Sequence, residues 1–600
     1  MPTISVYKDD IFELLGVQFT DDEFSDLIIC FGFEVDKVTC MSEEEIEVLP
    51  GQEDRIIYRV EIPANRYDCL CTEGLALALK AYLNSETPVL RALEPEERTV
   101  MRVKHTVKNV RPYVVCGILR GVTFTPESYA SFIALQDKLH ANICRDRKLV
   151  AIGTHDLSTI KAPFVYEARK PEDIQFVPLN QEVEITGVTM MDFYKETYLA
   201  PYLEIIEGME RYPSIYDSNG VLLSLPPIIN GDHSKIKLET RDVFIESTAM
   251  DHTKACIVMN VIISAFSMHC DEPFTFERVK VEYENEAGEV VIPDEIKNFT
   301  GNNELYYPDM KPVTLDVSAK YVSTMMGFEV SAQEQAEFLK KMMIVATVDD
   351  DNDTMHVSAP AWRSDILHPV DVMEDVAISY GYDNFPKRVP KLGVPGSQQY
   401  RNQFSEALRY ELVGTGFNEI LTFSLLSEED ISTNIKSDQL YVKTKDFKKK
   451  DMATVRNSLL PGLLKTLENN SSKPKPVKLF EVSDVVYLDE THETGARNHR
   501  QVAAAFGGLT SGFETVHGFL DRIMIAVGVD LNDYYIRPHS DPMFFPGRSG
   551  HVIVKYEGEE VHIGEIGTLH PEVLKNFNLN NSMVVTVVSI DLELFIQKGE

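Results

Sequence analysis

Four acidic side chains lie within an eleven-residue stretch of the sequence. They are Asp365, Asp371, Glu374 and Asp375. In a helix, the i, i+3 and i+4 spacing of the last three places their carboxylates on one face. Such carboxylates repel one another unless a cation neutralises them, and Mg²⁺ binds carboxylate oxygens while keeping several waters. The stretch therefore predicts either a Mg²⁺ site or a solvated acidic face that favours the helix N-terminus.

The residues around this cluster contain the start and stop signals of a helix. Pro369 suits the first helical position because its missing N–H needs no partner there. Gly381 suits the position after the last turn, and Pro386 prevents the helix from resuming. Four apolar side chains at helical spacing predict the face that packs on a core. They are Val370, Met373, Ala377 and Tyr380.

The segment before the acidic helix has an earlier counterpart. Residues 63–68 match residues 360–365 at Pro, Ala, Arg and Asp, in the pattern Pro-Ala-x-Arg-x-Asp. Each copy follows an apolar, strand-like run and precedes a helical pattern that ends near a tyrosine. Two copies are too few for a repeat array. They predict a duplicated small α/β module, of which only the second copy carries the acidic cluster.

A second group of polar side chains lies where predicted strands end, between residues 213 and 248. Asn219-Gly220 predicts a hairpin turn between two strands, and residues 243–248 form a further predicted strand. Binding and catalytic sites are usually built from residues at such strand ends and turns. The candidates are Ser224, Asp232, His233, Glu246 and Thr248.

The composition limits the class of protein. A chain of 600 residues should hold about three to five domains. The net charge of −36 argues against a surface that binds nucleic acid over its whole area. The first residues lack the features of a signal or transit peptide, and the longest apolar run, residues 255–268, is shorter than the roughly 20 residues of a membrane span. We therefore expect a cytoplasmic protein with no membrane segment.

The chain divides into four predicted regions with a multidomain α+β fold. The first module spans residues 1–90, and a central region of mixed strands and helices spans residues 105–275. The second module spans residues 276–388, and an antiparallel sheet domain spans residues 389–600. The sequence contains no G-x-x-x-x-G-K-[ST] phosphate loop, no G-x-S-x-G elbow and no H-E-x-x-H motif. The residues alone therefore indicate one acidic cluster and one polar pocket, without a reaction.

Several long segments, in the same order along the chain, resemble the beta subunits of phenylalanyl-tRNA synthetases of the archaeal and eukaryotic cytosolic type. The strongest matches are residues 63–68, 139–156, 215–233, 363–386, 458–464 and 545–549. The resemblance implies an (αβ)₂ heterotetramer that uses ATP to join phenylalanine to tRNA-Phe. It also implies that ATP and phenylalanine are bound mainly by the alpha subunit.

The resemblance implies that residues 389–600 form a class II synthetase-like domain without aminoacylation activity. In a class II core, an Arg-x-Glu pair holds the ATP and the amino acid. Here Arg456 is followed by Asn457 and Ser458, so the glutamate is absent. We therefore expect no aminoacylation residue in this chain and a domain that packs against the alpha subunit.

The central region resembles the editing domain of the family, which hydrolyses tyrosine wrongly attached to the tRNA. A pocket shaped for phenylalanine rejects an analogue with one extra hydroxyl only modestly, so a second hydrolytic site adds fidelity. A carboxylate can accept the hydrogen bond of the phenol. Glu246 and Thr248 match the positions at which members of the family recognise the tyrosine. The residues that match the editing pocket or lie near it in the sequence are Ile215, Ser224, Asp232, His233, Glu246 and Thr248.

The resemblance also favours the metal interpretation of the acidic cluster. All four carboxylates match the Mg²⁺ positions of the family, with the pattern D-x₅-D-x₂-[ED]-[ED] intact. The ion would be structural or would lie at the subunit boundary, because the ATP site belongs to the other chain.

Two alternatives to an editing beta subunit stay open. The chain could be a free-standing Tyr-tRNA deacylase that works without an alpha subunit, although the synthetase-like domain argues against it. It could instead be a non-catalytic scaffold subunit, in which Glu246 and Thr248 only contribute to the packing of the core.

Overall fold

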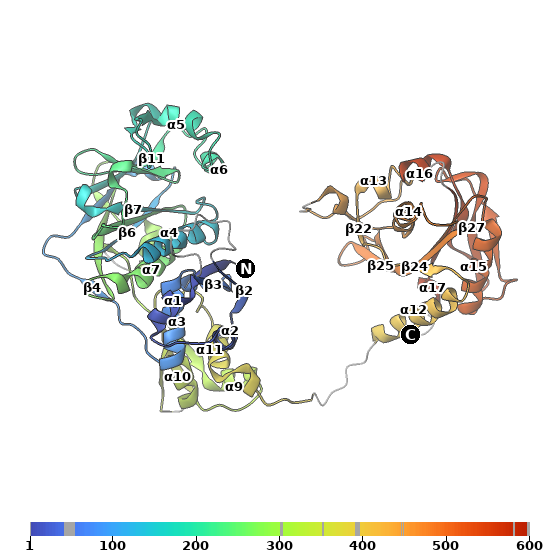
Figure 1. The fold of residues 1–600 in the computed structure, drawn as a ribbon, viewed down its shortest axis with the longest axis horizontal. Helices are drawn as coiled ribbons and strands as arrows, with labels where there is room; N and C mark the ends of the chain where they lie inside the picture. The colour runs from blue at the N-terminus through green and yellow to red at the C-terminus, as the bar shows by residue number, and fades with distance from the viewer. Residues whose placement is uncertain are drawn as a thin grey trace. The chain divides into compact units, whose positions relative to one another are not determined.

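The computed structural model describes residues 2–40, 55–300, 304–350, 353–389, 397–445, 447, 449–579 and 583–596. The chain forms two compact units, residues 1–388 and residues 389–600 (Figure 1). Both units combine helices with sheets of mixed or antiparallel strands. The predicted multidomain α+β class is therefore confirmed.

The first unit contains two modules with the same order of elements. The N-terminal module is built from β1 (Thr3–Tyr7), α1 (Lys8–Leu15), α2 (Asp21–Cys30), β2 (Glu34–Cys40), β3 (Ile56–Glu61) and α3 (Thr72–Asn84). The second module is built from β18 (Val313–Ser318), α9 (Ala319–Met326), α10 (Ala332–Lys340), β19 (Val345–Val348), β20 (Thr354–Ala359) and α11 (Pro369–Tyr380). Their antiparallel sheets have the equivalent orders β1-β3-β2 and β18-β20-β19. The repeated motif is thus matched by a repeated topology.

The Pro-Ala-x-Arg-x-Asp motif follows the central strand of each module and forms the same buried ion pair in both. The guanidinium of Arg66 donates to both carboxylate oxygens of Asp68, at 2.9 and 2.8 Å. Arg363 binds Asp365 in the same bidentate way, at 2.9 and 2.7 Å. This fork geometry fixes the direction of both side chains, which explains why the motif retains Arg and Asp at this spacing.

The second module has a core of its own, and a few of its residues also pack on the core of the N-terminal module. Trp362, beside the second motif, belongs to the same buried cluster as Phe31 and Phe33 of the N-terminal module. A Cβ atom on Gly32 would lie 3.6 Å from the Cδ1 atom of Ile378 in α11. Segments that are far apart in the sequence therefore lie side by side here, as α2 and α11 do in Figure 1.

A twelve-stranded mixed sheet occupies the chain between the two modules. Its main path runs through β13 (Ile229–Asn230), β12 (Leu222–Leu225), β11 (Tyr212–Tyr216), β8 (Phe164–Arg169), β5 (Val100–Val103), β15 (Thr275–Glu284), β6 (Tyr113–Leu119), β14 (Val243–Ala249) and β7 (Val150–Asp156). Helix α7 (His252–Phe266) packs on β6 and β14, with every residue from 258 to 266 buried. An apolar helix of this kind is expected inside a core. Among the described residues, no helix is both long and apolar enough to cross a membrane.

The second unit is organised around a seven-stranded sheet. Its order is β21 (Asn418–Glu419), β24 (Val477–Leu488), β25 (Ala496–Gly508), β29 (Val584–Asp591), β28 (Glu559–Leu569), β27 (Phe544–Tyr556) and β26 (Tyr534–Pro538). All neighbours are antiparallel except β21 and β24. Alternate residues of β25 enter two separate cores, because Val502 joins the α15 (Phe513–Ala526) side and Ala503 joins the α14 (Leu460–Asn469) side.

Arg456, which begins the incomplete Arg-x-Glu pattern, is bound inside this unit. Its Nη1 atom donates to Oε1 of Glu481 at 2.9 Å, and both side chains are buried. The Nε atom donates to the carbonyl oxygen of Asp484 at 2.8 Å. The guanidinium is therefore held by partners within its own chain.

Candidate functional site

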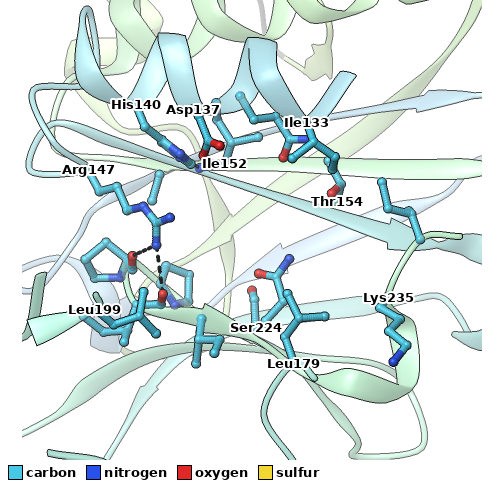
Figure 2. Close-up of a pocket in the computed structure, with 18 of the residues that line it drawn as sticks. Ile133, Asp137, His140, Arg147, Ile152, Thr154, Leu179, Leu199, Ser224 and Lys235 are labelled. Atoms are coloured by element: carbon cyan, nitrogen blue, oxygen red, sulfur yellow. Dashed lines mark hydrogen bonds between the residues drawn. The ribbon is translucent and has the colours of Figure 1, made fainter. Parts of the chain in front are cut away.

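A cavity of about 500 Å³ lies in the central sheet region (Figure 2). Helix α4 (Pro126–Ala141) supplies one wall, with Ile133, Asp137 and His140. Strand β7 supplies Ile152 and Thr154. The opposite wall in Figure 2 comes from Ser224 on β12, Leu179 and Lys235. The lining thus combines apolar side chains with a similar share of polar and charged ones.

Glu246 lies in this lining with its carboxylate almost completely buried. Its Oε1 atom accepts a hydrogen bond from the Ser224 hydroxyl at 2.9 Å. Its Oε2 atom is buried and has no hydrogen-bond partner in the described structure. Gly153 pairs with Glu246 across β7 and β14, and a Cβ atom at Gly153 would lie only 2.2 Å from Oε1. A glycine is therefore required for the carboxylate to occupy this position.

His140 and Arg147 form a basic corner of the same cavity. The Nε2 atom of His140 accepts the Ile152 N–H at 3.0 Å. Burial, together with the positive charges of Arg147 and Arg111, lowers the pKa of His140 to about 3. The imidazole is therefore neutral near pH 7, with its proton on Nδ1. The Nδ1 atom of His140 and the Nε atom of Arg147 are both buried without partners among the described atoms.

The main chain and an aromatic ring hold Arg147 at this corner. Its Nη1 atom donates to the carbonyl oxygen of Ile228 at 2.9 Å, one of the dashed lines in Figure 2. Its guanidinium lies over the Tyr202 ring, 4.3 Å from the centroid. The turn before β7 also has positive φ angles at Arg145, Asp146 and Arg147, from 47° to 64°. This strained turn places the arginine in the cavity.

Two of the six predicted pocket residues, Ser224 and Glu246, line the cavity. Ile215 is fully buried one strand away and pairs with Ser224. Thr248 is also fully buried, and its hydroxyl accepts a hydrogen bond from Nε of Arg111 at 3.2 Å. Both residues lie outside the described lining, so they support the wall instead of facing the cavity.

The other two predicted residues lie at the rim. Asp232 accepts the N–H of Asn180 at 2.8 Å and the ammonium of Lys235 at 2.9 Å. Asn180 and Lys235 belong to the lining, so Asp232 positions its neighbours. His233 is exposed and is not part of the lining that the structure describes.

His140 and Arg147 were not among the residues predicted from the sequence. His140 ends an amphipathic helix, and a run of basic residues follows it before a buried strand. That pattern was the available signal. However, nothing in the spacing shows that this helix end faces a hairpin more than seventy residues later.

The acidic cluster is divided among different partners in the structure. Arg363 binds Asp365 at 2.7 Å and Asp375 at 2.6 Å, both through Nη2. Asp371 accepts the backbone N–H groups of residues 367 and 368, at 2.9 and 2.8 Å. Glu374 is exposed. Burial raises the pKa of Asp375 to about 6, although Arg363 acts to lower it.

The core face predicted for the acidic helix is partly wrong. Val370 is 37% exposed, and Val372 and Val376 are fully buried in its place. Asp375 lies on the buried side with them because it must reach the buried Arg363. The three helix carboxylates therefore do not share one exposed face.

These four carboxylates do not fit a single Mg²⁺ ion as the structure places them. Among the described residues, they form no group whose oxygens converge on one point. Arg363 already supplies the positive charge that Asp365 and Asp375 need, and the helix N-terminus serves Asp371. The Mg²⁺ assignment stays a prediction.

Four domain families match the chain in sequence. The Phe-tRNA synthetase beta subunit B1 domain matches residues 1–85, and the B3/4 domain matches residues 98–261, which contain the cavity. The tRNA synthetase B5 domain matches residues 315–382. The phenylalanyl tRNA synthetase beta chain CLM domain matches residues 385–592.

Whole-chain relatives carry one consistent name. The phenylalanine–tRNA ligase beta subunit of Drosophila melanogaster is 44% identical over 99% of this chain and 100% of its own length. The cytoplasmic beta subunit of Arabidopsis thaliana is 39% identical over the same shares. The crystal structure of an N-terminal fragment of the phenylalanyl-tRNA synthetase beta subunit from Pyrococcus horikoshii covers 63% of this chain and 99% of the fragment, with 28% identity and a TM-score of 0.54. The chain belongs to the phenylalanine–tRNA ligase beta subunit family.

Proposed function

We propose that this chain is the beta subunit of a cytoplasmic (αβ)₂ phenylalanine–tRNA ligase and that it also edits mischarged tRNA. The alpha subunit binds ATP and phenylalanine and charges tRNA-Phe. The cavity beside Glu246 hydrolyses tyrosine from Tyr-tRNA-Phe. Residues 389–600 act as a class II synthetase-like domain without aminoacylation activity, in line with the internal pairing of Arg456 with Glu481.

The observation that carries the editing proposal is the unpaired Oε2 atom of Glu246. A buried acceptor without a partner costs free energy, so it favours a ligand that brings a donor. The phenol of tyrosine supplies an O–H at the end of a flat apolar ring, and phenylalanine supplies none. A site built to bind a hydroxyl rejects the analogue that lacks it far more strongly than an apolar pocket rejects an added hydroxyl. The cavity therefore selects tyrosine.

The basic corner complements this arrangement. His140 Nδ1 and Arg147 Nε are buried donors without partners in the described structure. The ester and the terminal ribose of a mischarged tRNA carry acceptor oxygens that suit them. In the hydrolysis, a water adds to the ester carbonyl carbon and the carbon–oxygen bond to the ribose breaks. The ribose oxygen leaves with a proton, which gives free tyrosine and an intact tRNA end.

Co-expression of this chain with and without a matching alpha subunit tests the proposal. We expect a tetramer by mass that forms Phe-tRNA only when the alpha subunit is present. With Glu246→Ala in the tetramer, Tyr-tRNA should accumulate while phenylalanine charging continues. The exposed Glu286→Ala variant is the control and should edit normally.

Each alternative gives a distinct result in the same experiment. A stable monomer that hydrolyses Tyr-tRNA by itself would identify a free-standing deacylase. A tetramer whose Tyr-tRNA hydrolysis is unchanged by Glu246→Ala would indicate that Glu246 only packs, as in a scaffold subunit.

A further inference from the structure

Two histidines and a glutamate converge on one surface of the second unit. One ligand atom from each of His551, His562 and Glu565 lies within 4.8 Å of the other two. Across the residues that the structure describes, no other group of His, Cys, Asp or Glu side chains converges in this way. The cluster belongs to a different unit from the editing cavity, and the proposed function does not use it.

The sheet register explains why these residues meet. His551 on β27 pairs directly with Glu565 on β28, so their side chains share a face. His562 lies three residues from Glu565, which in a regular strand would place it on the opposite face. The register shifts between residues 552 and 553, where Ile553 pairs with His562. Such a bulge re-aims the following side chain and so brings His562 to the side of His551.

The hydrogen bonds leave ligand atoms available. The Nε2 atom of His562 lies 2.9 Å from the carbonyl oxygen of Gly564. A carbonyl can only accept, so Nε2 carries the proton and Nδ1 keeps its lone pair. Metal-bound histidines are usually oriented in this way, through a hydrogen bond from the second ring nitrogen.

The distances suit a small tetrahedral ion. The Nε2 atom of His551 and the Oε1 atom of Glu565 are 3.6 Å apart. Ligands at the bond lengths of Zn²⁺ are about 3.4 Å from one another in a tetrahedron. The ring of His551 is also flanked on both sides, with centroids 3.7 Å from His539 and 4.1 Å from His562.

The surroundings favour a cation and leave room for a further ligand. His562 and Glu565 border a cavity of about 530 Å³ that Asp541 also lines. The carboxylates of Asp541 and Glu565 give this cavity negative charge, which attracts a cation.

We propose that His551, His562 and Glu565 bind one divalent transition-metal ion of the zinc class. Two imidazole nitrogens and one carboxylate suit Zn²⁺, Co²⁺ or Ni²⁺, whereas Mg²⁺ prefers oxygen ligands. A water molecule fills the remaining position on the side of the cavity.

Titration of the chelator-treated full-length chain with Co²⁺ tests this site. We expect one Co²⁺ per chain, with the strong visible absorption of a four-coordinate complex. Zn²⁺ should displace the Co²⁺, and excess Mg²⁺ should not. His562→Ala, at an exposed position, should weaken binding at least 10-fold, as loss of a metal ligand or its support does. His492→Ala, in an exposed turn, should bind as the unmodified protein does.

A second variant separates loss of a ligand from loss of structure. Glu565→Gln keeps the size of the side chain and removes its charge, so it should weaken Co²⁺ binding without lowering the melting temperature of the metal-free protein. The proposal is wrong if the unmodified chain binds no Co²⁺, if the His562 and Glu565 variants bind it equally well, or if Mg²⁺ displaces it.

Discussion

Replacing Gly153 with alanine perturbs the editing site without changing the side chain that is proposed to read tyrosine. The new Cβ atom would lie 2.2 Å from Oε1 and 2.8 Å from Cδ of Glu246. Neither distance is sterically possible, so the carboxylate must rotate away. Because Gly153 lies in the regular strand β7, the backbone can accept alanine, and the displacement falls on Glu246.

The size of the effect follows from the bonds that Glu246 loses. Rotation breaks its hydrogen bond with Ser224 and moves Oε2 away from the phenol. A hydrogen bond to a charged group contributes about 1.5–3 kcal/mol. At about 1.4 kcal/mol for each factor of ten, kcat/KM for Tyr-tRNA hydrolysis should fall by about 10- to 150-fold.

The assay is hydrolysis of Tyr-tRNA-Phe by the tetramer, followed together with phenylalanine charging. Charging should be unchanged, because the alanine lies in the editing cavity of this chain. Gly518→Ala is a matched control, since a Cβ atom at that helical position meets nothing within 4 Å. If the Gly153 variant hydrolyses Tyr-tRNA at the normal rate, the position of Glu246 does not determine editing, and the reasoning fails.

Three further predictions concern stability and metal binding. Arg363→Met should lower the free energy of unfolding of the first unit by about 3–5 kcal/mol, because it leaves two buried carboxylates unpaired. Lys340→Met breaks only an exposed pair and should cost less than about 1 kcal/mol; equal effects in denaturant melts would contradict the argument. The pKa of His140 is lowered to about 3 by burial, so the unfolded chain binds more protons below about pH 6.5 and stability should rise with pH up to there. His140→Asn should reduce that rise in urea melts at pH 4.5 and 7, and an unchanged rise would be evidence against a buried neutral imidazole. Asp371→Asn combined with Glu374→Gln should leave Mg²⁺ binding by the chain unchanged if the carboxylates keep the partners described above, whereas reduced binding would favour the Mg²⁺ site expected from the family.

The polar residues at predicted strand ends and the family resemblance together indicated two of the residues that line the cavity. Ser224 on β12 and Glu246 on β14 are not on adjacent strands of the sheet, yet both line the cavity. Thr248 shares a strand face with Glu246. However, its hydroxyl accepts a hydrogen bond from Arg111, which comes from a distant segment. His140 reaches the cavity because a helix packs over the sheet, and sequence spacing carries no information about that packing.

The acidic helix shows a different limit of sequence reasoning. The spacing placed three carboxylates on one face, and the termini at Pro369 and Tyr380 were correct. The direction that this face takes was not predictable from the spacing. The buried Arg363 requires a second carboxylate, and this requirement turns Asp375 inward. The buried face of the helix therefore combines Val372 and Val376 with one carboxylate that pairs with Arg363.

The packing of Trp362 and Ile378 against the N-terminal module has a consequence for synthesis on the ribosome. The N-terminal module is complete long before its partner surface around Trp362 and Ile378 has been translated. At about 5–20 residues per second, the intervening roughly 300 residues take about 15–60 s to emerge. During that interval the backbone at Gly32 lacks its contact with Ile378. The nascent chain therefore exposes an apolar surface that chaperones can bind, and stalling between the modules should promote aggregation.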